Sequence, residues 1–120
     1  MSLHADALKE SQVQRMSIKK ETTDILGLAD AELKSSHELG RCNAIISLPI
    51  LFSIPHMSNA IAQAKIYSIV IKSLEDRGFY VKLNMHNKNK RYLEITWMSN
   101  EEQKELDEQK KYIAEHTKQH

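Results

Sequence analysis

Cysteine, glycine, proline and aromatic residues are all scarce in this chain of 120 residues. The single cysteine, Cys42, excludes an internal disulfide, so we expect a reducing, intracellular compartment and not a secreted protein. Three glycines and two prolines are too few for a disordered or loop-rich chain. Hydrophobic residues make up 41% of the chain and aromatic ones 6%. This composition predicts one small domain with a modest core.

Long apolar runs are also lacking. A membrane-spanning helix needs roughly 18 consecutive apolar residues, and the longest candidate, residues 44–54, is interrupted by Ser47, Pro49 and Ser53. The first ten residues lack the basic region and apolar stretch of a secretory signal. We therefore expect neither membrane insertion nor secretion.

The formal net charge of +1 conceals an uneven distribution. Residues 1–40 carry a net charge of −2, residues 41–97 carry +5 and residues 98–120 carry −2. A basic middle can indicate an anionic partner. It can equally mean that the acidic ends pack on the middle of their own chain or of a neighbouring copy. We favour the interpretation in which the acidic ends pack on the basic middle.

Periodicity and capping signals predict four helices and three strands. The predicted helices are residues 4–20, 23–39, 58–77 and 99–116, and the predicted strands are residues 44–54, 79–85 and 91–97. Thr23 or Asp24 would begin the second helix, while Gly40 and Gly78 would each end one.

These elements predict an α+β fold, in which a three-stranded, mainly antiparallel sheet packs one face on the central helix 58–77. The terminal segments are expected to be helical and peripheral. The predicted parts are an N-terminal helical arm at 1–22, a compact core at 23–97 and an amphipathic C-terminal helix at 98–120. Nearly all middle turns of helix 58–77 are expected to be buried, including Ile61, Ile66 and Ile69. Leu83, Met85 and Leu93 are expected to anchor the hairpin to this helix.

No arrangement of residues indicates an active site. None of the six histidines stands at zinc-finger spacing with a second ligand type, and one cysteine cannot form a thiolate cluster. No glycine-rich loop is present that could hold phosphates. Arg41 precedes Cys42, and a neighbouring cation favours the reactive thiolate, but no histidine–acid pair accompanies it, so we expect an unreactive thiol. The sequence predicts no catalytic residue, no metal, no cofactor and no enzymatic activity.

The stretch "NMHNKNKRY" at residues 84–92 contains three cations and no acid. As the turn of a hairpin it would offer phosphate contacts. The candidate nucleic-acid-binding residues are Lys82, Lys88, Lys90 and Arg91. The preceding helix is too apolar to read a DNA groove, so any binding would be weak, salt-sensitive and independent of sequence. The alternative is a solvated loop that keeps the protein soluble.

The polar face of the predicted sheet carries Tyr80 and Tyr92 beside Lys82 and Glu94. If no terminal helix covers this face, we expect it to form a homodimer interface, because exposed strand edges and a small core both favour self-association. The candidate interface residues are Tyr80, Tyr92, Leu106 and Ile113. The two tyrosines could alternatively stack on single-stranded bases.

A pattern of short motifs runs through roughly residues 30–97. It comprises Gly40, the apolar segment from Ile45 to Ile54, the Leu74–Gly78–Phe79–Val81 series and the Ile95–Thr96–Trp97 ending. In these features the chain resembles small proteins of large DNA viruses, both tailed phages of the T4 kind and giant viruses such as the marseilleviruses. It departs from them at Pro49, at the aromatic pair 79–80 and in the helix that follows Trp97.

The resemblance implies a viral accessory or virion-packaged protein, often oligomeric, and it assigns no functional residue. It implies a location in the host cytoplasm or nucleus and in the virion, with other virion or host proteins as further partners. We therefore expect a self-associating structural or interaction protein without catalytic activity. The competing hypothesis is a small nucleic-acid-binding protein that uses the hairpin at 82–91.

Overall fold

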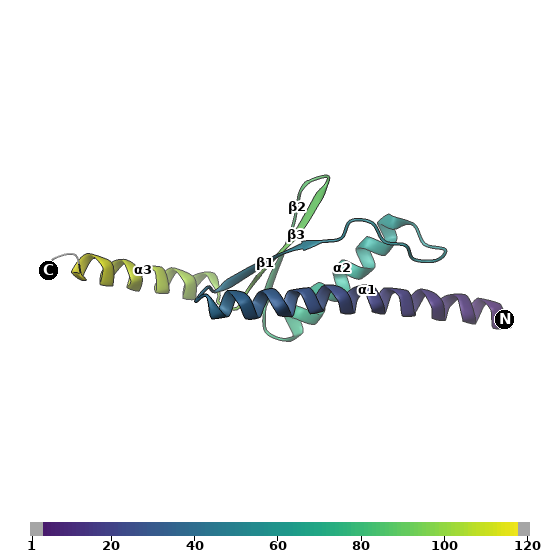
Figure 1. Ribbon diagram of the computed structural model, residues 1–120, viewed down its shortest axis with the longest axis horizontal. Coiled ribbons are helices and arrows are strands. Elements are labelled where there is room, and N and C mark those ends of the chain that lie inside the picture. Colours follow the sequence, from purple (N-terminus) through teal and green to yellow (C-terminus); the bar gives the residue numbers. More distant parts are fainter. Residues whose placement is uncertain (1–3, 118–120) are drawn as a thin grey trace.

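The computed structural model describes residues 4–117, which form an elongated molecule of 79 × 28 × 23 Å. The elements are α1 (Ala5–Glu38), β1 (Asn43–Leu48), α2 (Asn59–Asp76), β2 (Tyr80–Asn87), β3 (Lys90–Thr96) and α3 (Asn100–Thr117). The predicted α+β fold with helical terminal segments is confirmed. The outer ends of α1 and α3 lie at opposite ends of the molecule (Figure 1). The predicted segments 1–22 and 98–120 each extend beyond the described residues.

The N-terminal segment forms one helix of 34 residues where the sequence predicted two. The expected break at Thr23 and Asp24 is wrong, because no proline interrupts this stretch and the preceding threonine tolerates helical geometry. Thr22 is buried, and its hydroxyl donates a hydrogen bond to the Lys19 carbonyl at 2.9 Å. This bond to the preceding turn is a known way for threonine to occupy a helix interior.

The predicted helix ends at glycine are confirmed. Gly40 and Gly78 have φ angles of +74° and +91°. In this left-handed region a residue with a Cβ is strained, and glycine is not. At the start of α2, the Ser58 hydroxyl accepts a hydrogen bond from the Ile61 N–H at 3.3 Å. Ser99 likewise accepts from the Glu102 N–H at 3.1 Å at the start of α3. Local sequence signals therefore set these boundaries.

The predicted strand 44–54 is too long, because β1 ends at Leu48. Pro49 follows directly, and proline cannot donate a hydrogen bond to a sheet. The chain then leaves the sheet and forms an irregular loop, residues 49–57, which returns to the start of α2 (Figure 1). We call this segment the 49–57 loop.

The sheet has the strand order β1-β3-β2, and both pairs are antiparallel. On its inner face the side chains of Ile46, Leu93 and Leu83 stand in one row across the three strands. Helices α1 and α2 both pack on this inner face and on each other. The core therefore lies between two helices and one side of the sheet, and α1 contributes to it through Ile25 and Ala29.

Fewer side chains of α2 are buried than the sequence predicts. Ile66, Val70 and Leu74 are buried as expected, but Ile61 and Ile69 are exposed. Met85 is exposed too, although the sequence placed it in the core. The pairing of β2 with β3 shifts between Asn84 and Asn87. The strict alternation of faces is lost there, which accounts for Met85. Trp97, directly after the end of β3, is half-buried, and its ring centre lies 6.4 Å from that of His37.

No helix within residues 4–117 is both long and apolar enough to cross a membrane.

The glycines offer a matched test of backbone strain. Gly27 lies inside α1, where an added Cβ would meet no atom within 4 Å. We expect Gly27→Ala to raise the free energy of unfolding by about 1 kcal/mol, through helix propensity. Gly78 has equally open surroundings but a positive φ, so Gly78→Ala should lower it by about 1–2 kcal/mol. Urea denaturation of both variants measures the two effects, and equal signs would contradict this account.

Candidate interaction surface

The outer face of the sheet carries side chains from all three strands and no helix packs over it within the described chain. Its nine residues are Asn43, Ile45, Ser47, Tyr80, Lys82, Asn84, Tyr92, Glu94 and Thr96. Cross-strand pairing puts Ile45, Glu94 and Lys82 in one row. Ile45 is 54% exposed and Tyr80 is 55% exposed. Half-exposed apolar side chains on an uncovered sheet face are typical of a protein interaction surface.

The structure brings together some of the residues predicted at the interface. Tyr80 and Tyr92 both lie on the outer face, but in different rows, opposite Thr96 and Asn84 respectively. Tyr80 is exposed and Tyr92 is half-buried. Lys82 lies directly across from Glu94, so its charge is partly balanced by an acid on the same face.

The hairpin end is basic, as the sequence predicted, and it projects away from α1 (Figure 1). Lys88 and Lys90 are exposed, as is His86. Two asparagines shape the turn: Asn84 Oδ1 accepts from the His86 N–H at 3.1 Å, and Asn87 Oδ1 accepts from the Asn89 N–H at 2.9 Å. Such side-chain bonds two residues along the chain stabilise turns. The cations are therefore held on an ordered turn.

Arg91 differs from the lysines with which the sequence grouped it. It pairs with Leu48 on the inner side of the sheet and is half-buried. Its Nη1 donates to the carbonyls of Asn87 and, at 3.2 Å, Lys90. Its buried Nε has no hydrogen-bond partner among residues 4–117. Arg91 therefore supports its own hairpin, and the free cations of the tip are Lys88 and Lys90.

Arg91 also acts on a buried phenol. Burial raises the pKa of Tyr67 above its ordinary value, and the positive charge of Arg91 opposes this. Tyr67 is protonated at neutral pH and donates a hydrogen bond to the Pro49 carbonyl at 2.5 Å. Because the folded-state pKa is raised, the contribution of this phenol to stability is complete below pH of about 10. It is lost as the pH rises through the folded-state pKa.

The 49–57 loop is held by a row of polar side chains that the sequence analysis missed. Asn59, Gln63 and Tyr67 stand four residues apart on α2, so they share one face of the helix. Their partners in the loop are the carbonyls of Pro49 and Ile50, which accept hydrogen bonds, and the N–H of Phe52, which donates one. The four-residue spacing was the available signal. These bonds hold Ile50 and Phe52, the two neighbours of Leu51, and Leu51 itself is 82% exposed.

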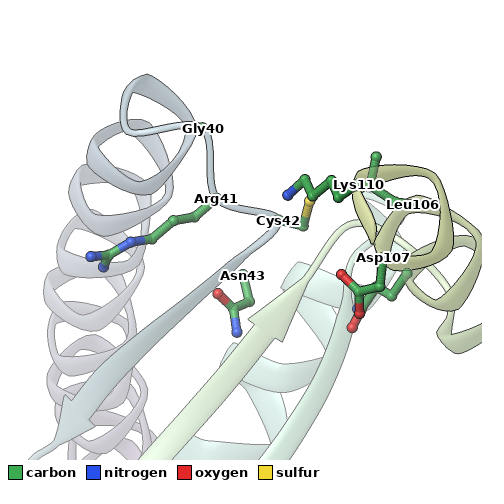
Figure 2. Close-up of a pocket in the computed structure, with 8 residues that line it drawn as sticks. Gly40, Arg41, Cys42, Asn43, Leu106, Asp107 and Lys110 are labelled. Carbon is green, nitrogen blue, oxygen red and sulfur yellow. The ribbon is translucent and has the colours of Figure 1, made fainter. Parts of the chain in front are cut away.

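Helix α3 contributes little to the core, since none of its residues is buried. Leu106 is half-buried and Ile113 is exposed. The first turns of α3 and the start of β1 border a hollow of about 250 Å³. Figure 2 shows Cys42 in this hollow, facing Leu106, Asp107 and Lys110 across the gap. The two predicted α3 interface residues therefore lie outside the core of their own chain, as an interface requires.

No group of three or more metal-ligating side chains exists among residues 4–117. No family model, curated protein or solved structure matches the chain.

Proposed function

We propose that this protein is a non-catalytic structural or interaction protein that self-associates, and that it serves as a viral accessory or virion-packaged component. One observation carries the proposal: within residues 4–117 no helix packs over the outer face of the sheet and no α3 side chain is fully buried, while both surfaces carry exposed apolar side chains. Burial of such surface is the main favourable term in most protein association.

Helix α3 supports self-association independently of the sheet. Its eighteen residues bury no side chain, and an isolated helix of this length is marginal in water. Packing on a second molecule would stabilise it. The interface residues we propose are Tyr80 and Tyr92 on the sheet with Leu106 and Ile113 on α3.

The viral part of the proposal is supported by the resemblance of residues 30–97 to small proteins of large DNA viruses. A role in the particle requires that the protein be present in it. Mass spectrometry of purified, protease-treated virus particles is the direct test. Absence of the chain from particles that contain known structural proteins would remove the packaging role.

Self-association has a simple expected result. The full chain has a mass of 13.9 kDa, and size-exclusion chromatography with light scattering should give twice this mass at micromolar concentration. Ile113→Glu, which puts a charge at an exposed apolar position of α3, should shift the protein toward the monomer. Glu115→Gln on the same helix is the control. A wild-type species of 13.9 kDa at all concentrations would overturn the proposal.

The basic hairpin end supports a second candidate function, non-specific nucleic-acid binding. Lys88 and Lys90 are exposed on an ordered turn, and no acidic residue occurs between Arg77 and Leu93. Such a tip contacts phosphates and does not read bases, so binding would weaken steeply with salt.

Lys88→Ala/Lys90→Ala separates this candidate from a solvated loop. If the tip binds duplex DNA, the double change should reduce the slope of log affinity against log salt by roughly 1.8, at about 0.9 per phosphate contact. Lys65→Ala/Lys72→Ala removes the same charge from exposed positions on α2 and should leave binding unchanged. Fluorescence anisotropy with a labelled duplex measures both. Equal effects of the two variants would reject the hairpin as a site.

A further inference from the structure

We propose that two copies join through antiparallel pairing of their β1 strands, and that α3 of each copy lies across the basic hairpin of the other. The inference rests on the proposed self-association and specifies its geometry. The dimer would then contain one continuous sheet of six strands. The α1 and α2 helices of both copies would lie on the same side of this sheet.

The first support is the contrast between the two edges of the sheet. β1 and β2 are the edge strands, since β3 lies between them. β2 has the features that protect an edge from pairing, a lysine at position 82 and an irregular register near its end. β1 has neither, and residues 43–54 contain no charged side chain. An unprotected, uncharged edge is the one available for pairing.

The alternation of side chains between the two faces of β1 restricts how two β1 strands can pair. Ala44, Ile46 and Leu48 point into the core, and a shift by one residue would move them to the outer face. A continuous sheet with both cores on one side therefore pairs outer residues with outer residues. With the two-fold axis at Ile45, this half-exposed side chain packs against its own copy.

Helix α1 supplies the second support. Asp30 faces α2, because its carboxylate pairs with Arg77 Nη1 at 2.9 Å. Leu28 stands two residues earlier, about 200° around the helix, and thus on the side away from α2. Leu28 and Leu39 are both exposed and eleven residues apart, which is about three turns. Pairing of β1 strands would bring these flanks of the two α1 helices toward each other.

Charge complementarity is the third support, and it follows from the strand directions. The hairpin turn lies at the Leu48 end of β1, while β3 ends and α3 begins at the Asn43 end. In an antiparallel β1 pair, the α3 of one copy and the hairpin turn of the other meet at the same end. Residues 100–117 carry six acids and three lysines, opposite the exposed Lys88 and Lys90.

The starting position and length of α3 are compatible with this contact. Asn100 and Gln103 border a hollow that Tyr80, Lys82 and Glu94 line on the outer face, so α3 begins on the outer side of its own sheet. Eighteen helical residues span about 27 Å. The partner's β3 would lie three strand spacings away, about 14 Å. Leu106 and Ile113 can then cover the partner's Tyr92. This arrangement pairs the acidic C-terminal segment with the basic middle of a neighbouring copy.

Cysteine cross-linking tests the strand pairing. In a Cys42→Ser background, Ile45→Cys should form a disulfide-linked dimer under mild oxidation, because its two copies would face each other across the two-fold axis. Lys82→Cys, also at an exposed position of the outer face but on the other edge strand, is the matched control and should stay monomeric on a denaturing gel.

Charge reversal tests the α3 contact. Lys88→Glu/Lys90→Glu should weaken the dimer at least about tenfold, and Glu105→Lys/Glu108→Lys in α3 should restore it when combined. Circular dichroism is used to check that each variant is folded. A wild-type monomer would overturn self-association itself. A wild-type dimer that cross-links through position 82, or through neither position, or that charge reversal fails to rescue, would overturn only the geometry proposed here.

Discussion

Ile66→Ala is expected to lower the free energy of unfolding by about 2–5 kcal/mol. The Ile66 side chain, on α2, is fully buried in the core that α1, α2 and the sheet form. Its truncation leaves a cavity that the close-packed neighbours fill only in part. The total free energy of unfolding of a domain is only about 5–15 kcal/mol, so this loss is a large share of it. Urea denaturation measures it.

Ile69→Ala is the matched control, because it makes the same chemical change on the same helix three residues away. Ile69 is 44% exposed, so its truncation creates no enclosed cavity, and the higher helix propensity of alanine partly offsets the loss. We expect a change within about 1 kcal/mol. A loss at Ile69 as large as at Ile66 would mean that the exposed side of α2 is buried in solution, for instance against a second copy.

Asn59→Ala is expected to lower the free energy of unfolding by about 1–3 kcal/mol and to free the 49–57 loop. The Asn59 side chain accepts from the Phe52 N–H at 2.8 Å and donates to the Ile50 carbonyl at 3.0 Å. Both loop groups lose this partner when the amide is removed. Hydrogen exchange at the Phe52 amide should accelerate in the variant, while exchange at Leu93 in the central strand should not.

Asn59→Asp separates the two bonds. A carboxylate still accepts from the Phe52 N–H but cannot donate to the Ile50 carbonyl. Its negative charge is favourable in the first turn of a helix. We expect a smaller loss than for alanine and continued protection of the Phe52 amide. Equal exchange in both variants would show that the Ile50 bond holds the loop.

The sequence predicted the elements well where local chemistry decides them. Gly40 and Gly78 marked helix ends correctly, because a left-handed glycine acts within one turn. The alternation in residues 79–97 predicted the hairpin for the same reason. The sequence failed at Thr23, where a capping residue lies inside a helix, because the same side chain is compatible with both positions.

The candidate surface was predicted only in part. Lys88 and Lys90 are exposed as expected, but Arg91 turns to the inner side of the hairpin. No local pattern separates three neighbouring cations, since the strand register decides which face each one takes. The loop-holding row on α2 was missed for a related reason. Its partners are loop backbone groups 7 to 18 residues away in the chain.

By itself, the sequence determined the α+β class, the antiparallel hairpin, the ends of most helices and the uneven distribution of charge. These follow from periodicity, capping and composition, which act over a few residues. Only the tertiary structure decided that α1 is continuous, that Ile66 is buried while Ile69 is exposed, and that α3 contributes no buried residue to the core. Burial depends on which elements meet, and nonlocal packing sets that. The outer sheet face is uncovered because α1 and α2 pack on the same side of the sheet, and β1 has a free edge because only β3 pairs with it.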